Sequence, residues 1–312
     1  VMGMAAYGKP KYNLEKIISF DTKKGKIVSN LKKIISRNIN SNINEPIYNQ
    51  NIIYKMTKVK KRDSSAKFTQ KHYDLAASVQ QQFTNVYLEL INYFSKKSQI
   101  KSLCLSGGCA LNCLANAKLL QTFKKVYVMP ASSDRGLSLG NAMYYAAKNS
   151  INVQKPKNMF LGPSYSNKEI LYYLNRINLN YQIVNNANED CATQIKNGKV
   201  VAWFQGRSEF GPRALGARSI LANPKIYKMK KILNQKIKYR EDYRPFAPSI
   251  IEDDIKEYTK FSEELEYMTI TLNIDSKLKK QIPEAVHFDN TARIHLVKKD
   301  SNPKLHFFWA FV

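Results

Sequence analysis

The clearest hydrophobic pattern in the chain spans residues 72–97. Apolar side chains recur there at steps of three and four residues, and charged side chains occupy the opposite face. This periodicity predicts a long amphipathic helix. The apolar stripe is typical of a core-facing surface, and its members are Leu75, Val79, Phe83, Val86, Leu90 and Phe94. We therefore expect this helix to supply core packing and no ligand contacts.

Short apolar runs that lead into loops predict two strands. Ile100–Leu105 runs into the sequence SGGCALNCLANAKL, which predicts a strand, a turn at Gly107-Gly108 and then a helix. Val126–Met129 is the second apolar run, and it is followed by a loop that carries Asp134 and by another helix. Because strands and helices alternate through residues 72–148, this part of the chain is predicted to be α/β.

A stretch without periodicity suggests the domain organisation. Residues 149–165 hold two prolines and a glycine between patterned segments, which is typical of a linker. We therefore divide the chain into a domain at 1–150 with a variable insertion at 11–65, a linker at 151–158, and a domain at 159–312. The second domain is expected to contain helices at about 167–177, 188–196 and 225–238 and strands at about 181–184 and 200–204.

Composition adds a large positive charge to this picture. The 312 residues include 50 Lys and Arg against 24 Asp and Glu, which gives a formal net charge of +26. Such an excess favours polyanionic partners such as nucleic acid, an anionic membrane or a phosphorylated substrate. A lysine-rich compositional bias, which accompanies many Asn and Ile residues along the whole chain, explains the charge equally well.

Cysteine content and hydropathy restrict the class of protein. Four cysteines are too few and too irregularly spaced for a disulfide framework or a zinc knuckle, and they suggest a reducing, cytoplasmic location: Cys104, Cys109, Cys113 and Cys191. No apolar run approaches the ~20 residues of a membrane span, and no signal-peptide pattern is visible. Val1 lies inside what looks like a motif, VMGMAAYGKP, and residues 307–312 are almost wholly apolar, so both ends are expected to be cut.

Residues 206–219, GRSEFGPRALGARS, form the strongest candidate site. The stretch follows an apolar run at 200–204 that predicts a buried strand, and glycines allow its backbone to approach a ligand closely. Guanidinium groups bind phosphate and carboxylate oxygens with two parallel hydrogen bonds. The stretch therefore predicts a site for a phosphorylated small molecule. The alternative is a solvated basic loop, which does not require the interspersed Phe210 and Leu215. The three arginines of the stretch are Arg207, Arg213 and Arg218.

Two later stretches add charged and polar side chains. KYREDYRPFAPSI carries Arg240 and Arg244 beside prolines that exclude a helix, so these arginines are expected on a rigid turn. AVHFDNTARIHLV has polar residues at alternate positions, which would share one face of a strand. Such a face is most often solvated, although this combination, which includes a histidine, is better suited to binding. The four residues are His287, Asp289, Thr291 and Arg293.

Two loops at predicted strand ends are further candidates. The order of strand, Gly107-Gly108 turn and helix points backbone N–H groups and a helix N-terminus at an anion. Asp134 follows the next strand, in a common position for a metal ligand or for an acid near a phosphate site. The same position fits a helix N-cap, and these residues alone leave both interpretations open.

Five stretches in this order resemble one family, the O-carbamoyltransferases of the NodU/CmcH/TobZ type. They are SGGCALNCLAN, SSDRGLSLGNA, GRSEFGPRALGARSILANP, REDYRPFAPSI and HFDNTAR, and the opening VMGMAAYGKP also fits. The matches span residues 1–10 and about 72–300, and FGPRALG and RPFAP are the most specific among them.

The resemblance implies two catalytic domains and two reaction steps. The first domain would be the C-terminal part of an actin-like (ASKHA) domain related to the tRNA threonylcarbamoyl transferase TsaD, and the second an incomplete YrdC-like domain. The family's YrdC-like domain makes carbamoyl-adenylate from carbamoyl phosphate and ATP and releases pyrophosphate. Its actin-like domain transfers the carbamoyl group to a hydroxyl of a sugar, antibiotic or other natural product, near a divalent metal (iron or similar).

The resemblance also implies residue roles. Gly107, Gly108 and Asn112 would bind nucleotide, and Asp134 would be a metal ligand. The pocket for carbamoyl phosphate and ATP would be lined by the catalytic Arg213, Arg218, Arg244 and His287 and by the binding residues Arg207, Arg240 and Arg293.

The chain departs from the family in ways that bear on activity. The family's metal site also needs an HxxxH pair, yet no two of the four histidines here lie four apart, and the later NTSFN stretch is missing. Ser133 also stands where the family usually has Gly. The 312 residues alone are therefore expected to be poorly soluble, to bind metal weakly and not to transfer carbamoyl groups. Metal binding is expected to be weak because catalytic sites normally present about three protein ligands to a metal, and Asp134 would be one ligand alone.

Two other functions stay open at this point. A tRNA threonylcarbamoyladenosine enzyme is favoured by the net charge, although FGPRALG and RPFAP argue against it and no RNA-stacking motif is present. A non-catalytic remnant is favoured by the expected cut ends.

Overall fold

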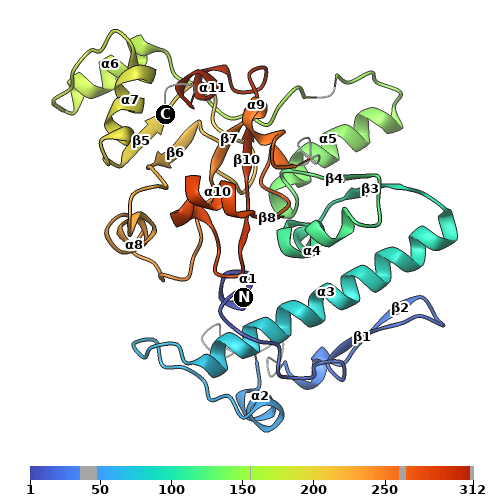
Figure 1. Ribbon diagram of the computed structural model, residues 1–312. Helices are drawn as coiled ribbons and strands as arrows, with labels where there is room; N and C mark the ends of the chain where they lie inside the picture. Colours follow the sequence, from blue (N-terminus) through green and yellow to red (C-terminus); the bar gives the residue numbers. More distant parts are fainter. Residues whose placement is uncertain (36–47, 155, 260–264, 310–312) are drawn as a thin grey trace.

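The computed structural model describes residues 1–35, 48–154, 156–259 and 265–309 as a mixed α/β molecule (Figure 1). Each sheet in these ranges has two strands. The helices are α1 (Met2–Ala5), α2 (Gln50–Thr57), α3 (Gln70–Ser98), α4 (Cys113–Leu119), α5 (Leu137–Lys148), α6 (Asn167–Arg176), α7 (Ala187–Lys196), α8 (Met229–Ile232), α9 (Glu252–Ile255), α10 (Ser276–Gln281) and α11 (Pro303–Trp309). The strands are β1 (Ile18–Asp21), β2 (Lys26–Ser29), β3 (Ser102–Leu105), β4 (Lys125–Val128), β5 (Val201–Phe204), β6 (Arg218–Leu221), β7 (Ser249–Ile251), β8 (Leu272–Asn273), β9 (Thr291–Ala292) and β10 (His295–Val297). Short helical turns are η1 (Leu31–Lys33), η2 (Gly108–Leu111), η3 (Asp134–Gly136), the π-helical η4 (Leu233–Ile237) and η6 (Pro283–Ala285).

Helix α3 confirms the predicted long helix, but its apolar stripe is not its buried face. Of that stripe Val86 is buried, whereas Val79 and Phe94 are 39% and 54% exposed. The other buried positions of α3 are small or polar: Asp74, Ala76, Ala77, Ser78, Gln80 and Thr84. The prediction is wrong here because α3 contacts α1, β1 and α4, so its buried surface is spread around the helix instead of following one stripe.

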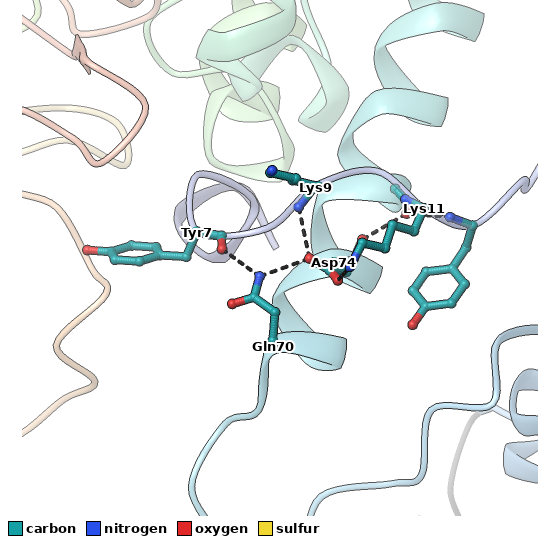
Figure 2. Close-up of polar contacts among 7 residues, drawn as sticks. Tyr7, Lys9, Lys11, Gln70 and Asp74 are labelled. Carbon is teal, nitrogen blue, oxygen red and sulfur yellow. Dashed lines mark hydrogen bonds and ion pairs between the residues drawn. The ribbon is translucent and has the colours of Figure 1, made fainter.

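Asp74 fastens the N-terminal segment, residues 1–12, to α3 (Figure 2). Its carboxylate accepts hydrogen bonds from the backbone N–H of Lys9 and from Gln70 Nε2, both at 2.9 Å, and forms an ion pair with Lys11 Nζ at 2.8 Å. Asp74 is only 2% exposed. The hydrogen bond from Lys11, followed by those from Lys9 and Gln70, lowers the pKa of Asp74 to about 2.

Further contacts hold the same segment against the helix backbone. The hydroxyl of Ser78 accepts hydrogen bonds from the N–H groups of Lys11 and Tyr12, both at 3.0 Å. A side chain at Gly8 would collide with the backbone carbonyl of Tyr73, so only glycine allows this approach. The segment and the first turns of α3 therefore form one unit.

The parallel strands β3 and β4 carry two of the candidate loops. Their inward side chains join a hydrophobic cluster with α3 and α4, made of Ala110, Leu119, Phe123, Val126 and Val128 with Tyr87, Leu88 and Ile91 packed against it. Because parallel strands end at the same sheet edge, the Gly107-Gly108 turn and the loop at Ser133 are neighbours. A Cβ placed on Gly108 would be 3.9 Å from Ser133 Cβ.

The second half of the chain agrees with some predicted elements and corrects others. Helices α6 and α7 confirm those expected at 167–177 and 188–196, and β5 confirms the strand at 200–204. The expected burial of this strand is wrong, since Phe204 is 53% exposed. The strand expected at 181–184 is wrong, since these residues are irregular and Ile183 is 80% exposed, without the burial that a sheet neighbour provides. The helix expected at 225–238 is shorter, with α8 and η4 together covering 229–237.

The predicted strand at 287–293 is also wrong for most of its length. Asn290 has left-handed backbone with φ of 63°, and only Thr291 and the residue after it form a strand. Hydrogen bonds close the turn from the N–H of Asn290 to the carbonyl of His287 (3.0 Å) and from the N–H of His287 to the carbonyl of Thr291 (2.7 Å). A turn, not an alternating strand face, therefore brings these side chains together.

The main hydrophobic core lies in the second half, between β7, β10 and α10. It consists of Ile250, Ile255, Leu265, Ile270, Ile274, Leu278, Ile282, Ala285, Ala292, Ile294 and Leu296. Residues 149–165 contain no helix or strand at the positions that the structure describes, as expected of a linker. The domain boundaries themselves stay a prediction. Within the described ranges, no helix is both long and apolar enough to cross a membrane.

We expect Asp74→Asn to destabilise the protein by about 2 kcal/mol near pH 7, because a charged acceptor of several hydrogen bonds is lost. The folded-state pKa of Asp74 is depressed to about 2, so its contribution is present above the unfolded-state pKa and disappears as the pH falls toward 2. Urea unfolding followed by circular dichroism between pH 2.5 and 7 measures this. Asp300→Asn, at an exposed position, is the control. A stability difference that does not shrink at low pH would contradict the account.

Candidate functional site

One cavity collects most of the charged residues that the sequence predicts as ligand-binding. It has a volume of about 370 Å³ and is lined from the second half by Arg213, Lys230, Arg240, Tyr243, Arg244, Pro245, His287, Phe288, Asp289 and Arg293. The first half contributes Val1, Met2, Gly3, Ala6, Tyr7, Cys113 and Leu114. We call this cavity the arginine pocket. Five basic side chains face one carboxylate among its described lining residues, so it suits an anion.

The 206–219 stretch, which carries Arg213, has its backbone held by one acid, Glu209. Glu209 Oε1 accepts hydrogen bonds from the backbone N–H groups of Leu215 and Ala217, both at 2.8 Å, and of Arg218 at 3.1 Å. Leu215 is 3% exposed and packs in a cluster with Phe210. Leu215 is therefore buried and Phe210 half-buried, which excludes a fully solvated loop for this part of the stretch. Arg213 Nη2 reaches the carbonyl of Leu111 at 3.5 Å.

Arg207 and Arg218 lie outside the pocket lining, and both hold backbone carbonyls. Arg218 donates from Nη1 to Gln205 and Ala217, both at 2.8 Å, and its guanidinium lies 3.5 Å from the Phe204 ring centroid. Arg207 donates to a carbonyl of the preceding linker region, Leu161 O, at 2.8 Å. The ligand roles predicted for these two arginines stay predictions, and the geometry gives both residues a structural task.

The turn that carries Arg240 and Arg244 is held by a fully buried amide. Asn234 accepts a hydrogen bond from Arg240 Nε at 2.7 Å and donates to the carbonyl of Arg244 at 2.9 Å. The guanidinium of Arg240 also lies 4.7 Å from the centroid of the Phe246 ring. Arg244 is more exposed and pairs with Glu241 at 3.2 Å. Both arginines thus reach the pocket from one fixed turn, as predicted.

Positive charge in the pocket is only partly offset, by Glu241 beside Arg244 and by Asp289 in the lining. Burial, with a further contribution from Arg293, lowers the pKa of Arg213 to about 10. Burial and the neighbouring Arg244 and Arg293 also lower the pKa of Arg240. These guanidinium groups remain charged at neutral pH. Among the described residues, three buried nitrogens that line the pocket have no hydrogen-bond partner: Arg213 Nε, His287 Nε2 and Arg293 Nε. Buried polar atoms are nearly always satisfied, so the two arginine nitrogens, which are donors, indicate a site for an acceptor-rich ligand.

His287 is held in one orientation by a short chain of hydrogen bonds. The hydroxyl of Thr291 donates to Asp289 Oδ1 at 2.8 Å, and His287 Nδ1 lies 3.0 Å from the same hydroxyl oxygen. Because the hydroxyl proton is used, His287 Nδ1 must be the donor, which leaves Nε2 as the unprotonated nitrogen. Burial lowers the pKa of His287 to about 4, and Arg293 and Lys230 act in the same direction. The imidazole is therefore neutral at pH 7 and can accept a proton or a hydrogen bond at Nε2.

The residues predicted to bind nucleotide lie at the carboxyl end of β3. Gly107 has φ of 89°, and an added Cβ there would meet nothing within 4 Å, so its backbone faces open space. Asn112 caps α4 by accepting from the N–H of Ala115 at 3.2 Å and exchanges two hydrogen bonds with Gln80, both at 3.1 Å. The turn has room for a ligand, whereas the Asn112 side chain is engaged in tying α3 to α4.

Asp134 is exposed at the start of η3, next to the Gly107-Gly108 turn. Among the described residues no three His, Cys, Asp or Glu side chains are grouped as a metal site would require. One carboxylate does not make a metal site, so the residues present do not by themselves fit the metal that the resemblance implies. We derive no chemical step through it, and the role of Asp134 stays a prediction.

Sequence reasoning missed three residues of this site. Lys230 lines the pocket but is one of several lysines in the basic 225–238 stretch, so nothing in the pattern distinguishes it. Glu209 is the single acid in a basic loop, and that contrast could have identified it. Tyr7 belongs to the glycine-rich opening VMGMAAYGKP, which resembled a motif without indicating a role for any of its side chains.

Comparison with known proteins identifies the family of the chain. Residues 1–143 match the model of a carbamoyltransferase N-terminus, and residues 192–310 match that of a carbamoyltransferase C-terminus. Nodulation protein NolO of Bradyrhizobium diazoefficiens is 35% identical over 246 residues, covering 76% of this chain and 45% of the relative. Nodulation protein NolNO of Sinorhizobium fredii is 34% identical over 249 residues, covering 75% and 36%.

A relative of unassigned function covers almost the whole chain. An uncharacterized protein of Synechocystis sp. is 33% identical over 346 aligned residues, which are 98% of this chain and 54% of the relative. The chain thus spans about half the length of this relative and less of the nodulation proteins. With both family regions matched in order, and the arginine of FGPRALG and that of RPFAP meeting in one pocket, the chain belongs to the carbamoyltransferase family of the NodU type.

Proposed function

We propose that the arginine pocket binds carbamoyl phosphate and the phosphates of ATP, and that carbamoyl-adenylate forms there. The observation that carries the proposal is the set of buried, unpartnered nitrogens of Arg213, His287 and Arg293 in one cavity. Forming the adenylate brings two polyanions together, so their repulsion and the charge of the departing pyrophosphate must be offset. Guanidinium groups without carboxylate partners are suited to that task.

The proposed first step balances with one water molecule. Water cleaves the carbamoyl–phosphate bond, which leaves carbamate and inorganic phosphate. A carbamate oxygen then attacks the α-phosphorus of ATP, and the bond to pyrophosphate breaks. Neutral His287, with Nε2 free, can accept the proton that the attacking water loses. The guanidinium groups of Arg213, Arg240 and Arg293 would offset the negative charge of the phosphates.

The second step is proposed for the first half of the chain, as part of a longer protein. The acceptor hydroxyl attacks the carbamoyl carbon, a new C–O bond forms and AMP leaves, while the hydroxyl proton passes to solvent or a base. Gly107 and Gly108 would let the adenylate approach the backbone. Asp134 would be one ligand of the divalent metal that the family resemblance implies. The acceptor would be a sugar, an antibiotic or another hydroxyl-bearing natural product.

This division assigns an actin-like origin to residues 1–150 and a YrdC-like origin to residues 159–312. The parallel β3–β4 unit with ligand loops at its carboxyl edge supports the first, since open α/β sheets bind ligands at that edge. A tRNA-modifying function rests on the net charge of +26 and on the domain ancestry that the resemblance implies, whereas the carbamoyltransferase matches favour a small-molecule acceptor.

We expect Arg213→Ala to weaken binding of carbamoyl phosphate or ATP by ~2–4 kcal/mol, the usual cost of removing one partner of a desolvated charged contact. Isothermal titration calorimetry with each ligand measures it. Arg176→Ala, which removes an exposed arginine on α6, is the matched control and should change neither affinity. Unchanged affinity of the Arg213 variant for both ligands would remove the assignment.

We expect Gly108→Val to block carbamoyl transfer while leaving carbamoyl-phosphate-dependent pyrophosphate release largely intact. A Cβ at Gly108 has only Ser133 Cβ nearby, at 3.9 Å, so the fold has room for a valine side chain. That side chain would occupy the space that the adenylate needs. Both activities are measured in protein that carries the complete transferase, with Gly140→Val, in open space on α5, as control. Equal loss of both activities would show that the two steps share one site.

A further inference from the structure

Tyr7 is a pocket residue of the first half that contacts two pocket residues of the second. Its ring stacks on Phe288, with centroids 4.7 Å apart and an interplanar angle of 18°. Its hydroxyl oxygen accepts a hydrogen bond from Lys230 Nζ at 3.1 Å. All three side chains line the arginine pocket. Figure 2 shows the Tyr7 ring pointing away from α3, while the backbone carbonyl of Tyr7 accepts a hydrogen bond from Gln70.

The backbone of Tyr7 is fixed by the Asp74 contacts described above. Gln70 Nε2 donates to the carbonyl of Tyr7 at 3.0 Å and to Asp74 Oδ1 at 2.9 Å. The next residue, Gly8, lies directly on the α3 backbone, and Lys9 donates its N–H to Asp74 at 2.9 Å. The backbone of Tyr7 is therefore fixed by α3 and not by the segment that carries Lys230.

Lys230 differs from the other basic residues of the pocket in what holds it. Arg240 is oriented by the Asn234 amide and Arg244 by the Glu241 carboxylate. In the described part of the chain, the ammonium of Lys230 has no carboxylate within ion-pair distance, and its hydrogen-bond partner is the neutral Tyr7 phenol. A flexible four-carbon side chain loses entropy when it is held in one place. A fixed, uncharged acceptor orients it without cancelling its charge.

We propose that Tyr7 is a positioning residue for Lys230, and that the pair completes the arginine pocket as a site for a phosphate oxygen. This inference rests on the proposed function in that it takes the pocket as the anion site. The phenol oxygen accepts a hydrogen bond from one N–H of the ammonium, and its own O–H stays available as a donor. The ammonium and the phenol together can therefore present donors to the ligand. The contacts of Asp74 with Lys9, Lys11 and Gln70 thereby link the first half of the chain to anion binding in the second.

A double-mutant cycle tests the coupling. Pyrophosphate is the probe, and its affinity is measured by isothermal titration calorimetry for the unaltered chain, Tyr7→Phe, Lys230→Met and the double variant. Tyr7→Phe keeps the ring that stacks on Phe288 and removes only the hydroxyl. We expect it to weaken pyrophosphate binding about tenfold, the effect of losing one hydrogen bond to a charged group. In the Lys230→Met background the same change should have less than about a twofold effect, because its action passes through Lys230.

Tyr12→Phe is the matched control, since it removes a hydroxyl from the same segment outside the pocket lining, and it should leave pyrophosphate affinity unchanged. Thermal unfolding of each variant separates a loss of fold from a loss of binding. Equal effects of Tyr7→Phe in both backgrounds, or no effect in either, would overturn the positioning role while leaving the anion site intact. Absence of pyrophosphate binding by the unaltered chain would instead overturn the anion site of the proposed function, and this inference with it.

Discussion

The excess of positive over negative charge in the arginine pocket is the constraint on which this structure depends. Arg213 and Arg293 repel each other in the arginine pocket, and the pKa of Arg213 is lowered as a result of burial and this repulsion. Two carboxylates that lie outside the pocket lining bind the backbone. Asp74 accepts a hydrogen bond from a backbone N–H group of the N-terminal segment. Glu209 accepts hydrogen bonds from three backbone N–H groups of the 206–219 stretch. The acids therefore organise the backbone, and the unneutralised cations are left for a ligand.

The same arrangement joins the two halves of the chain. Arg213 reaches the carbonyl of Leu111 in η2, and Tyr7 stacks on Phe288 and accepts a hydrogen bond from Lys230. The N-terminal segment that carries Tyr7 lies between α3 and the second half (Figure 1). A change in the packing of α3 would thus be felt in the pocket through a few side chains, which gives the family's two regions a physical reason to occur in one chain.

Sequence patterns predicted the pocket better than they predicted the elements around it. The family resemblance grouped seven residues in one pocket, and the structure brings five of them into one cavity, whereas Arg207 and Arg218 lie outside its lining. The five are Arg213, Arg240, Arg244, His287 and Arg293. The element predictions failed where local pattern and tertiary surroundings conflict. The apolar stripe of α3 is partly solvated because neighbours on other sides bury its small and polar residues. The alternating polar residues at 287–293 form a turn because Asn290 adopts a left-handed backbone.

By itself the sequence determined which chemistry is present: guanidinium groups on glycine- and proline-rich stretches, a helix long enough to support them, and the motifs that identify the family. Only the tertiary structure decided how each group is used. Arg207 and Arg218 have the same local signature as Arg213, yet their hydrogen bonds go to backbone carbonyls while Arg213 enters the pocket. Lys230 and Tyr7 have no distinguishing sequence signal at all. The physical reason is that side-chain direction depends on long-range contacts, such as Asp74 with Lys9 and Tyr7 with Lys230, which join residues 65 and 223 positions apart.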